Sequence, residues 1–173
     1  MGRENLVAEI LNKIYICGKT ELPEFAQKGI THLISIQSPP GTLEQPAWFK
    51  GDYLKLIFSD IVKLEKENIT NPYRKLAREE DIECALEFGR CFFKKDSGKM
   101  LIHCAGGYSR SPAIALAIIA DYLGPGEEKR AVAHMKKIRP PAAPNIHVVH
   151  ITDLILEREE RLLNAVYEIR RKK

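Results

Sequence analysis

Long hydrophobic runs are missing from this sequence of 173 residues, in which the longest wholly apolar stretch covers only residues 113–120. About 20 apolar residues are needed to cross a bilayer as a helix, so we expect no transmembrane segment and no membrane partner. The first ten residues carry Arg3, Glu4 and Glu9 and contain no apolar segment typical of a signal peptide. We therefore expect a cytoplasmic protein.

Low-complexity segments, internal repeats and Gly/Ser-rich linkers are also missing, and this length is typical of one domain. Hydrophobic residues make up 45% and charged residues 29% of the chain, which excludes disorder. The net charge is only +4, and acids and bases are interspersed, so we expect no nucleic-acid partner. The basic run at residues 170–173 is expected to be a solvated helix end. We predict a single domain over residues 1–173.

Short β-rich segments alternate with helical patterns, which is typical of an α/β fold. The predicted strands cover residues 7–10, 14–17, 30–36, 53–58 and 99–103. Helices are predicted over residues 20–29, 79–95 and 112–122, between Gly126 and Pro140, and from Asn145 to residue 169 in one or two pieces. The expected fold is a central, mostly parallel, twisted sheet flanked by helices, with a helical C-terminal half.

The segment over residues 99–112 carries the strongest chemical signal. A predicted buried strand ends in His103 and Cys104, a loop with two glycines follows and leads to Arg110, and a mostly apolar helix is predicted from Pro112. Consecutive N–H groups in such a loop can bind an anion, and the positive end of the helix dipole adds to their field. The Arg110 guanidinium can bind two phosphate oxygens, and the same field favours the thiolate form of Cys104. The segment therefore predicts a phosphate-binding loop with a nucleophile at its base.

Cys84 is also followed by an arginine six positions later, but it lies inside the predicted helix over residues 79–95. N–H groups inside a helix are already bonded, and positions six apart point about 120° away from each other. Only Cys104 therefore has the strand, the glycines and the helix together. The cysteines are expected to be free thiols, with Cys84 and Cys91 on one buried helix face.

The segment around Cys104 resembles the motif of the protein tyrosine phosphatase superfamily, which reads His-Cys, five residues, Arg, and then Ser or Thr. The resemblance is closest to the compact dual-specificity-like and prokaryotic members. Residues 14–18 and 29–36 look like the opening strands of the family, and residues 139–145 look like its Arg-Pro and Pro-Asn segment. Nearly the whole chain is covered in the right order. The resemblance implies the cysteine-phosphatase fold.

The resemblance implies hydrolysis of a phosphomonoester through a phosphocysteine intermediate. Cys104 would attack phosphorus, and Arg110 would hold the charged oxygens. Ser111 would hydrogen-bond the sulfur, or would only cap the helix; His103 would support the loop, or would only be a core residue. The loop residues expected to bind substrate are Ala105, Gly106, Gly107, Tyr108 and Ser109.

The leaving oxygen requires a proton from a carboxylic acid. Asp60 is the preferred candidate because it follows a predicted strand directly, where the family places its acid; Asp81, at a predicted helix start, is the second candidate. The 44 positions between Asp60 and Cys104 exceed the spacing in most compact members. The extra residues, roughly 62–77, are therefore expected to form a lid or flank. Asn145 is expected to brace the loop or the acid, or only to cap a helix.

No metal and no cofactor are expected. His147, His150 and Asp153 fall at helical spacing, but no second set of ligands matches them, and the chain lacks a Gly-x4-Gly-Lys-Ser/Thr motif. Arg74 and Arg78, in and after the extra segment, are expected to be solvated rather than to add positive charge near the site.

Two other functions stay open: a sulfurtransferase-like enzyme with a persulfide on Cys104, and a non-catalytic phosphate-binding module. The former would need neither Asp60 nor a fixed Arg110. Residues 105–109 contain no Lys or Arg, which favours a phosphorylated protein, tyrosine first, over multiply phosphorylated inositols. A small phosphomonoester is the alternative substrate, and the sequence leaves the oligomeric state unassigned.

Overall fold

Four parallel strands form the central sheet of the computed structural model, which describes residues 7, 9–65, 70–95 and 98–171. They are β1 (Ile14–Gly18), β2 (His32–Gln37), β3 (Asp52–Ile57) and β4 (Met100–Cys104), in the order β1-β4-β2-β3. Parallel strands bring their carboxyl ends to one edge of the sheet. At this edge Cys104 lies in register with Gly18. The predicted α/β class with a parallel sheet is confirmed.

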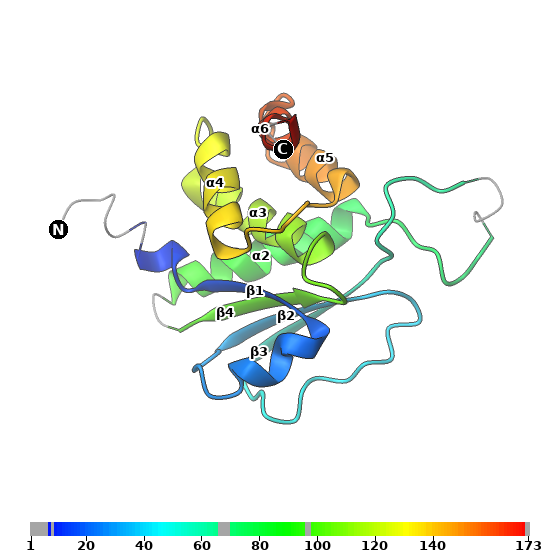
Figure 1. Cartoon of the computed structure of the whole chain (residues 1–173), viewed down its shortest axis with the longest axis vertical. Coiled ribbons are helices and arrows are strands. Elements are labelled where there is room, and N and C mark those ends of the chain that lie inside the picture. Colours follow the sequence, from blue (N-terminus) through cyan, green and yellow to red (C-terminus); the bar gives the residue numbers. More distant parts are fainter. Residues whose placement is uncertain (1–6, 8, 66–69, 96–97, 172–173) are drawn as a thin grey trace.

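The long helices lie on one face of the sheet, and a short 3-10 helix lies on the other (Figure 1). The short element is η1 (Lys19–Phe25). The others are α2 (Glu79–Lys94), α3 (Arg110–Leu123), α4 (Glu128–Ile138), α5 (Ile146–Ile155) and α6 (Arg161–Arg171). The predicted helical C-terminal half is therefore present. Within the described residues, no helix has the length and apolar character needed to cross a bilayer.

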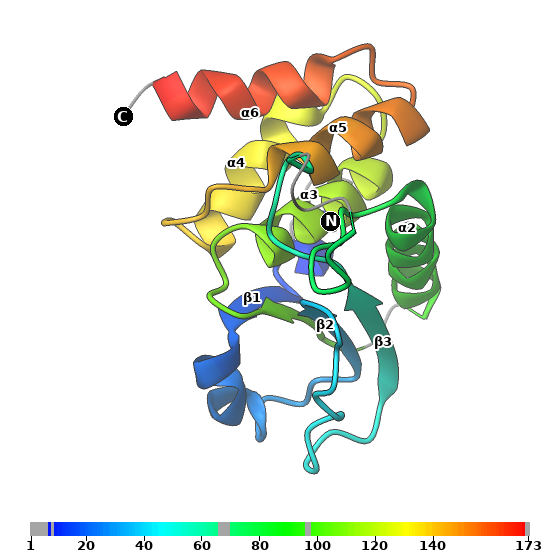
Figure 2. The same cartoon turned by 90° about the vertical axis from the view of Figure 1, so that its right-hand side faces the viewer.

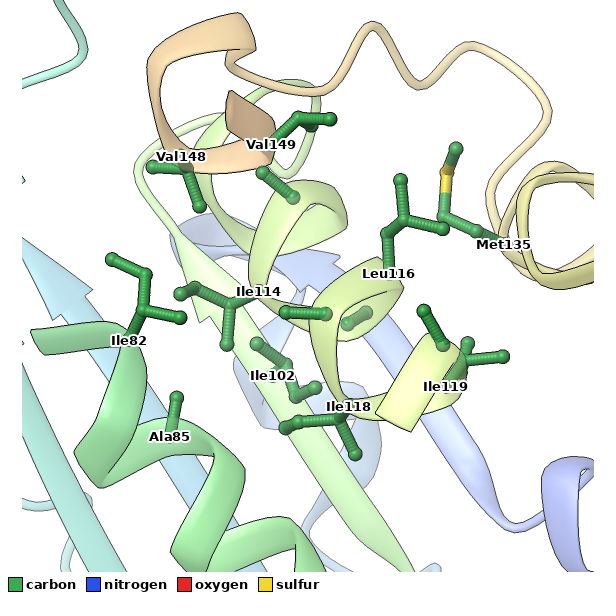
Figure 3. Packing of buried hydrophobic residues seen from close by; sticks show 14 of the residues in the cluster. Ile82, Ala85, Ile102, Ile114, Leu116, Ile118, Ile119, Met135, Val148 and Val149 are labelled. Carbon is green, nitrogen blue, oxygen red and sulfur yellow. The ribbon is translucent and has the colours of Figure 1, made fainter. Parts of the chain in front are cut away.

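Helix α3 is the centre of the hydrophobic core, and all of its residues from Arg110 to Ala120 are buried. A helix that is apolar on nearly every side must be covered on every side. The sheet supplies Ile102, α2 supplies Ile82, α4 supplies Met135 and α5 supplies Val148 (Figure 3). This packing fixes the start of α3 beside the end of β4, where the predicted phosphate-binding loop joins them.

The predicted strand over residues 7–10 is wrong. Residues 9–11 are helical, and β1 begins only at Ile14. A short apolar run fits a strand or a helix equally well. Val7 and Leu11 are four positions apart, the spacing of one helix face, and both pack against the main core.

Two further details differ from the predictions. The helix predicted over residues 20–29 is the shorter η1, which contains Pro23. Its first turn is closed by Glu21, whose carboxylate accepts from the Gly18 N–H at 2.6 Å. Cys84 and Cys91 are free thiols as expected but exposed, because α2 buries a different face. That face consists of Ile82, Ala85, Leu86, Gly89 and Phe92.

Candidate active site

Cys104 ends β4 with its side chain almost fully buried, at 3% exposed. Its Sγ accepts hydrogen bonds from the Ser111 hydroxyl at 3.2 Å and from the Gly107 N–H at 3.3 Å. Both donors point at the sulfur, where they would stabilise the negative charge of a nucleophile. Ser111 therefore contacts the sulfur from the first turn of α3, as one of its two predicted roles requires.

The loop over residues 105–109 turns its carbonyl oxygens away from the sulfur. Each of these five carbonyl oxygens accepts a hydrogen bond from outside the loop. The donors are Lys19 N to residue 105, Arg139 Nη2 to residue 106, Arg139 Nε to residue 107, Ala143 N to residue 108 and Asn145 N to residue 109. Because a peptide group is planar and trans, an outward carbonyl points the next N–H inward. The outward Gly106 carbonyl thus accompanies the Gly107 N–H that reaches Cys104. The outside contacts thus fix the backbone of the loop in a direction that the predicted phosphate-binding role requires.

Gly107 is required by the close approach of this loop to β1. Its φ is +73°, a left-handed conformation that favours glycine. A Cβ at this position would lie 2.6 Å from the carbonyl carbon of Cys17 and 2.6 Å from the nitrogen of Gly18. A side chain at residue 107 would therefore displace the loop from the sheet edge.

Arg139 braces the loop from outside, a role that sequence reasoning missed. Its guanidinium pairs with both Glu21 carboxylate oxygens at 2.8 Å, and its Nε donates to the Gly107 carbonyl at 3.2 Å. The same group lies 5.0 Å from the ring centre of Tyr108, which is half exposed at the rim. Hydrogen bonds from Arg139 and from the Gly18 N–H hold the pKa of the Glu21 carboxyl below its usual value. The ion pair thus connects η1 to the loop.

Arg110 is held rigidly beside the loop and is only 4% exposed. Its Nη1 donates to the Phe58 carbonyl at 2.9 Å and to the Ser38 hydroxyl at 3.0 Å. Its Nε is buried and has no hydrogen-bond partner among the described residues. A buried donor without an acceptor costs free energy, and an oxyanion would satisfy it.

A cavity of about 220 Å³ opens beside Cys104 and Arg110. The loop after β2 closes its far side, and the complete lining is Lys19, Ile36, Gln37, Ser38, Pro40, Gly41, Thr42, Leu43, His103, Cys104, Ala105 and Arg110. The cavity brings the predicted nucleophile and the predicted anion-binding guanidinium to one space.

Asp60 is attached directly to this loop. Its Oδ1 accepts from the Ser109 hydroxyl at 2.6 Å and from the Asn145 Nδ2 at 2.9 Å. The Asn145 side-chain oxygen accepts from the N–H groups of His147 and Val148, which caps α5. Asn145 therefore makes the contacts that both of its predicted roles require. The Asp60 carboxylate itself is exposed, as a group that exchanges protons with a ligand must be.

Asp81, the second candidate acid, lies elsewhere. Its Oδ2 accepts from the Arg78 N–H at 2.9 Å, so its carboxylate closes the first turn of α2. A carboxylate is stabilised there by the helix dipole, which explains the residue without a catalytic role. The structure thus brings Asp60, rather than Asp81, to the loop.

His103 lies on β4 in register with Cys17 and is 3% exposed. Neither ring nitrogen has a hydrogen-bond partner of ordinary geometry among the described residues. Burial lowers the pKa of His103 to about 4, against a smaller opposite effect of the Cys104 backbone. His103 is therefore neutral near pH 7, and its predicted support of the loop from behind stays a prediction.

The extra segment flanks the site as a closed loop. Ser59 joins its two ends, because the Ser59 N–H donates to the Lys75 carbonyl at 2.7 Å and the hydroxyl donates to the Tyr73 carbonyl at 3.2 Å. Residues 66–69 of the predicted flank lie outside the described residues. Arg74 lines a cavity with Asp60, whereas Arg78 is exposed and lies 3.6 Å from Glu80.

The residues at helical spacing that resemble a set of metal ligands have other hydrogen-bond partners in the structure. The Asp153 carboxylate accepts from the N–H groups of Glu160 and Leu162, and His147 Nε2 lies 2.9 Å from the Ala77 carbonyl oxygen. Among the described residues, no group of three or more His, Cys, Asp or Glu side chains is arranged to hold a metal ion.

No family model matches the chain. The mouse protein named dual specificity protein phosphatase 15 is 29% identical over 144 residues, which make up 82% of this chain and 54% of that protein. The chain thus spans about half the length of this curated relative.

Solved structures share the fold at lower identity. The human tyrosine phosphatase-like serine/threonine/tyrosine-interacting protein matches with a TM-score of 0.62 and 24% identity, over 84% of this chain and 92% of that one. The structure of DUSP15 matches with a TM-score of 0.58 and 21% identity, over 93% and 92% of the two chains. The structure of human DUSP28 matches with a TM-score of 0.57 and 17% identity, over 86% of this chain and 94% of that one. The chain is thus similar in sequence to a dual specificity protein phosphatase and shares the fold of compact phosphatases of this kind.

Proposed function

We propose that the protein is a cysteine-dependent phosphomonoester hydrolase that acts on phosphorylated proteins, with tyrosine specificity or dual specificity. The observation that carries this proposal is the Ser109 contact to Asp60 at 2.6 Å. It ties a carboxylic acid to the same short loop that surrounds the Cys104 sulfur with hydrogen-bond donors. A nucleophile, an anion site and a proton donor thus belong to one structural unit.

In the first step, the Cys104 thiolate attacks phosphorus, and the bond between phosphorus and the leaving oxygen breaks as the sulfur–phosphorus bond forms. The loop N–H groups and Arg110 bind the three equatorial oxygens, where the charge spreads in the transition state. Asp60 gives its proton to the leaving oxygen. The Arg110 Nε, buried without a partner in the described structure, supplies a fixed donor for this purpose.

In the second step, water attacks the phosphocysteine, and the sulfur leaves as thiolate. The Asp60 carboxylate accepts the proton of the water, so the acid of the first step becomes the base of the second. The Ser111 hydroxyl, 3.2 Å from the sulfur, stabilises the departing thiolate. The products are inorganic phosphate and the starting enzyme.

The loop residues support a protein substrate. Residues 105–109 include no cationic side chain that would hold a second phosphate of an inositol inside the loop. Tyr108, 52% exposed at the rim and stacked on Arg139, offers a flat apolar wall for an aromatic phosphoamino acid. The name of the mouse relative is consistent with this substrate class.

The test is hydrolysis of an aryl phosphate, with rapid denaturation during turnover to capture the phosphorylated enzyme. We expect phosphate release, a phosphorylated peptide that contains Cys104, and loss of both in Cys104→Ser. Chelators are expected to leave the rate unchanged. If the wild type binds vanadate but hydrolyses no phosphate ester, the protein is a phosphate-binding module instead. If cyanide removes a sulfur atom from Cys104 as thiocyanate, Cys104 carries a persulfide and the protein is a sulfurtransferase.

A further inference from the structure

A second and larger cavity, of about 500 Å³, lies directly beside the proposed active site. It is bounded by the extra segment after β3, by the start of α5 and by the last turn of α6; its lining is Asp60, Ile61, Val62, Lys63, Leu64, Glu65, Arg74, Ser109, Asn145, Ile146 and Arg170. In Figure 2 the segment after β3 rises from the sheet towards α5. Asp60 and Ser109 belong both to this cavity and to the proposed active site, so a group bound here would adjoin the leaving oxygen.

The charges of this lining are unevenly compensated. Of its two carboxylates, Glu65 pairs with Lys63 at 2.9 Å, and Asp60 is bound by Ser109 and Asn145. In the described part of the chain, neither Arg74 nor Arg170 pairs with a carboxylate. The lining therefore holds three cations, Lys63, Arg74 and Arg170, against the two carboxylates, and its formal charge stays positive even when Asp60 is ionised.

One of these arginines is held in place at the cavity. Arg170 Nη2 donates to the Pro144 carbonyl at 2.7 Å, a neutral acceptor that orients the side chain without cancelling its charge. Pro144 directly precedes Asn145, the residue that binds Asp60. The positive end of the α5 dipole faces the same space, because α5 begins at Ile146. The expectation that the basic end of the chain is only solvated is therefore too simple for Arg170; residues 172–173 lie outside the described residues.

We propose that Arg74 and Arg170 form an accessory anion-binding subsite, which selects phosphopeptides with a second anionic side chain next to the phosphate that is removed. This inference rests on the proposed function. One extended residue advances the chain by about 3.3–3.6 Å, so a residue one or two positions from the phosphorylated one reaches the cavity. The second anion is a carboxylate or another phosphate, because a guanidinium binds both through paired N–H groups.

The test compares three phosphotyrosine peptides that are identical except at the two flanking positions, which carry Gln, Glu or phosphothreonine. The measured quantity is kcat/KM for each peptide relative to the Gln peptide. We expect the wild type to prefer at least one anionic peptide by about tenfold, since two guanidinium groups bind the second anion together. The Glu and phosphothreonine peptides separate recognition of a carboxylate from recognition of a phosphate.

Arg74→Gln and Arg170→Gln should each reduce this preference about threefold or more, and the double variant should bring it close to one. Arg78→Gln is the matched control, because Arg78 is exposed close to the same segment and does not line the cavity. It should keep the wild-type preference. Raising the salt concentration should weaken the preference, as for any exposed charge pair.

Equal kcat/KM for all three peptides, or a preference that survives in the double variant, would overturn the subsite. Two further measurements separate failure of the subsite from failure of the proposed function. One is hydrolysis of an aryl phosphate by the wild type, and the other is calorimetric binding of the same peptides to Cys104→Ser. If the aryl phosphate is not hydrolysed, the proposed reaction is wrong, and the binding preference still decides the subsite. If it is hydrolysed and the peptides bind equally, only the subsite is wrong.

Discussion

Asn145 holds Asp60 with one end of its side-chain amide and caps α5 with the other. Its Nδ2 lies 2.9 Å from Asp60 Oδ1, and its Oδ1 accepts from the N–H groups of His147 and Val148. The side chain is buried, at 4% exposed. A single residue therefore fixes the proposed acid to the helical layer, and a substitution can separate its two contacts.

Asn145→Ser should keep the cap, because serine is about as good an N-cap residue as asparagine, but should lose the hydrogen bond to Asp60. We expect a melting temperature near that of the wild type and a clear fall in kcat for substrates with poor leaving groups. Asn145→Ala should lose both contacts and about 1 kcal/mol of stability. Thermal unfolding and steady-state kinetics of both variants test this. An Asn145→Ser variant with wild-type kcat would show that Asp60 needs no brace.

Asp60→Asn should slow hydrolysis of phenyl phosphate by about 10²–10⁴, because its leaving oxygen must be protonated as it departs. The effect should be much smaller for an aryl phosphate with a strongly acidic phenol, which leaves as an anion. The ratio of the two rates is the measurement. Asp81→Asn is the control and should not change the ratio, since Asp81 closes the first turn of α2. The reverse result would make Asp81 the acid.

Arg139→Lys should lower kcat/KM by about tenfold or more, although the positive charge is kept. Lysine lacks the planar group that contacts Glu21 and the Gly106 and Gly107 carbonyls together, so the loop N–H groups lose their fixed direction. The inhibition constant of inorganic phosphate should rise with it, which a purely structural role would not require. Arg130→Lys, at an exposed arginine of α4, serves as the control. A wild-type inhibition constant in Arg139→Lys would contradict this role.

Iodoacetamide at pH 6 should modify Cys104 faster than the exposed Cys84, because the described residues direct hydrogen-bond donors at the sulfur of Cys104 and not at that of Cys84. Vanadate should protect Cys104. Cys17 should stay unmodified in the folded protein, because burial and the nearby Glu21 raise its pKa to about 12. Peptide mapping by mass spectrometry measures all three sites. A Cys104 that reacts no faster than Cys84 would contradict the thiolate nucleophile.

The free energy of unfolding should fall as the pH drops from about 6.5 towards 4. Burial lowers the pKa of His103 to about 4 in the folded state, so the unfolded chain binds a proton in this range and the folded chain does not. Between pH 6 and pH 5 this linkage removes about 1 kcal/mol of stability, and above pH 7 it has no effect.

Urea unfolding of His103→Gln at these pH values isolates the contribution, because the pKa values of His32 and His134 are also lowered by burial. His150→Gln, at an exposed histidine, is the matched control and should keep the wild-type slope. An unchanged slope in His103→Gln would show that His103 titrates normally.

The sequence by itself determined the parallel α/β class and the loop from His103 to Ser111. The information for this loop is local, since a β-rich strand, two glycines and an apolar helix follow each other directly in the sequence. Helix α3 was predictable for the same reason, because a segment that is apolar on all sides can only be buried. Asp60 was predictable as a candidate from its position after a strand.

Only the tertiary structure brings Asp60, rather than Asp81, to the loop, since the contact of Asp60 with Asn145 joins residues 85 positions apart. The ion pair of Arg139 with Glu21 spans 118 positions. The cavity that contains Arg74 and Arg170 likewise needs the extra segment and α6 to be in place. Such polar contacts leave no periodic pattern in the chain, because each depends on one side chain meeting another across the folded core. Hydrophobic periodicity reports which face is buried, and the packing of those faces then determines which charged groups meet.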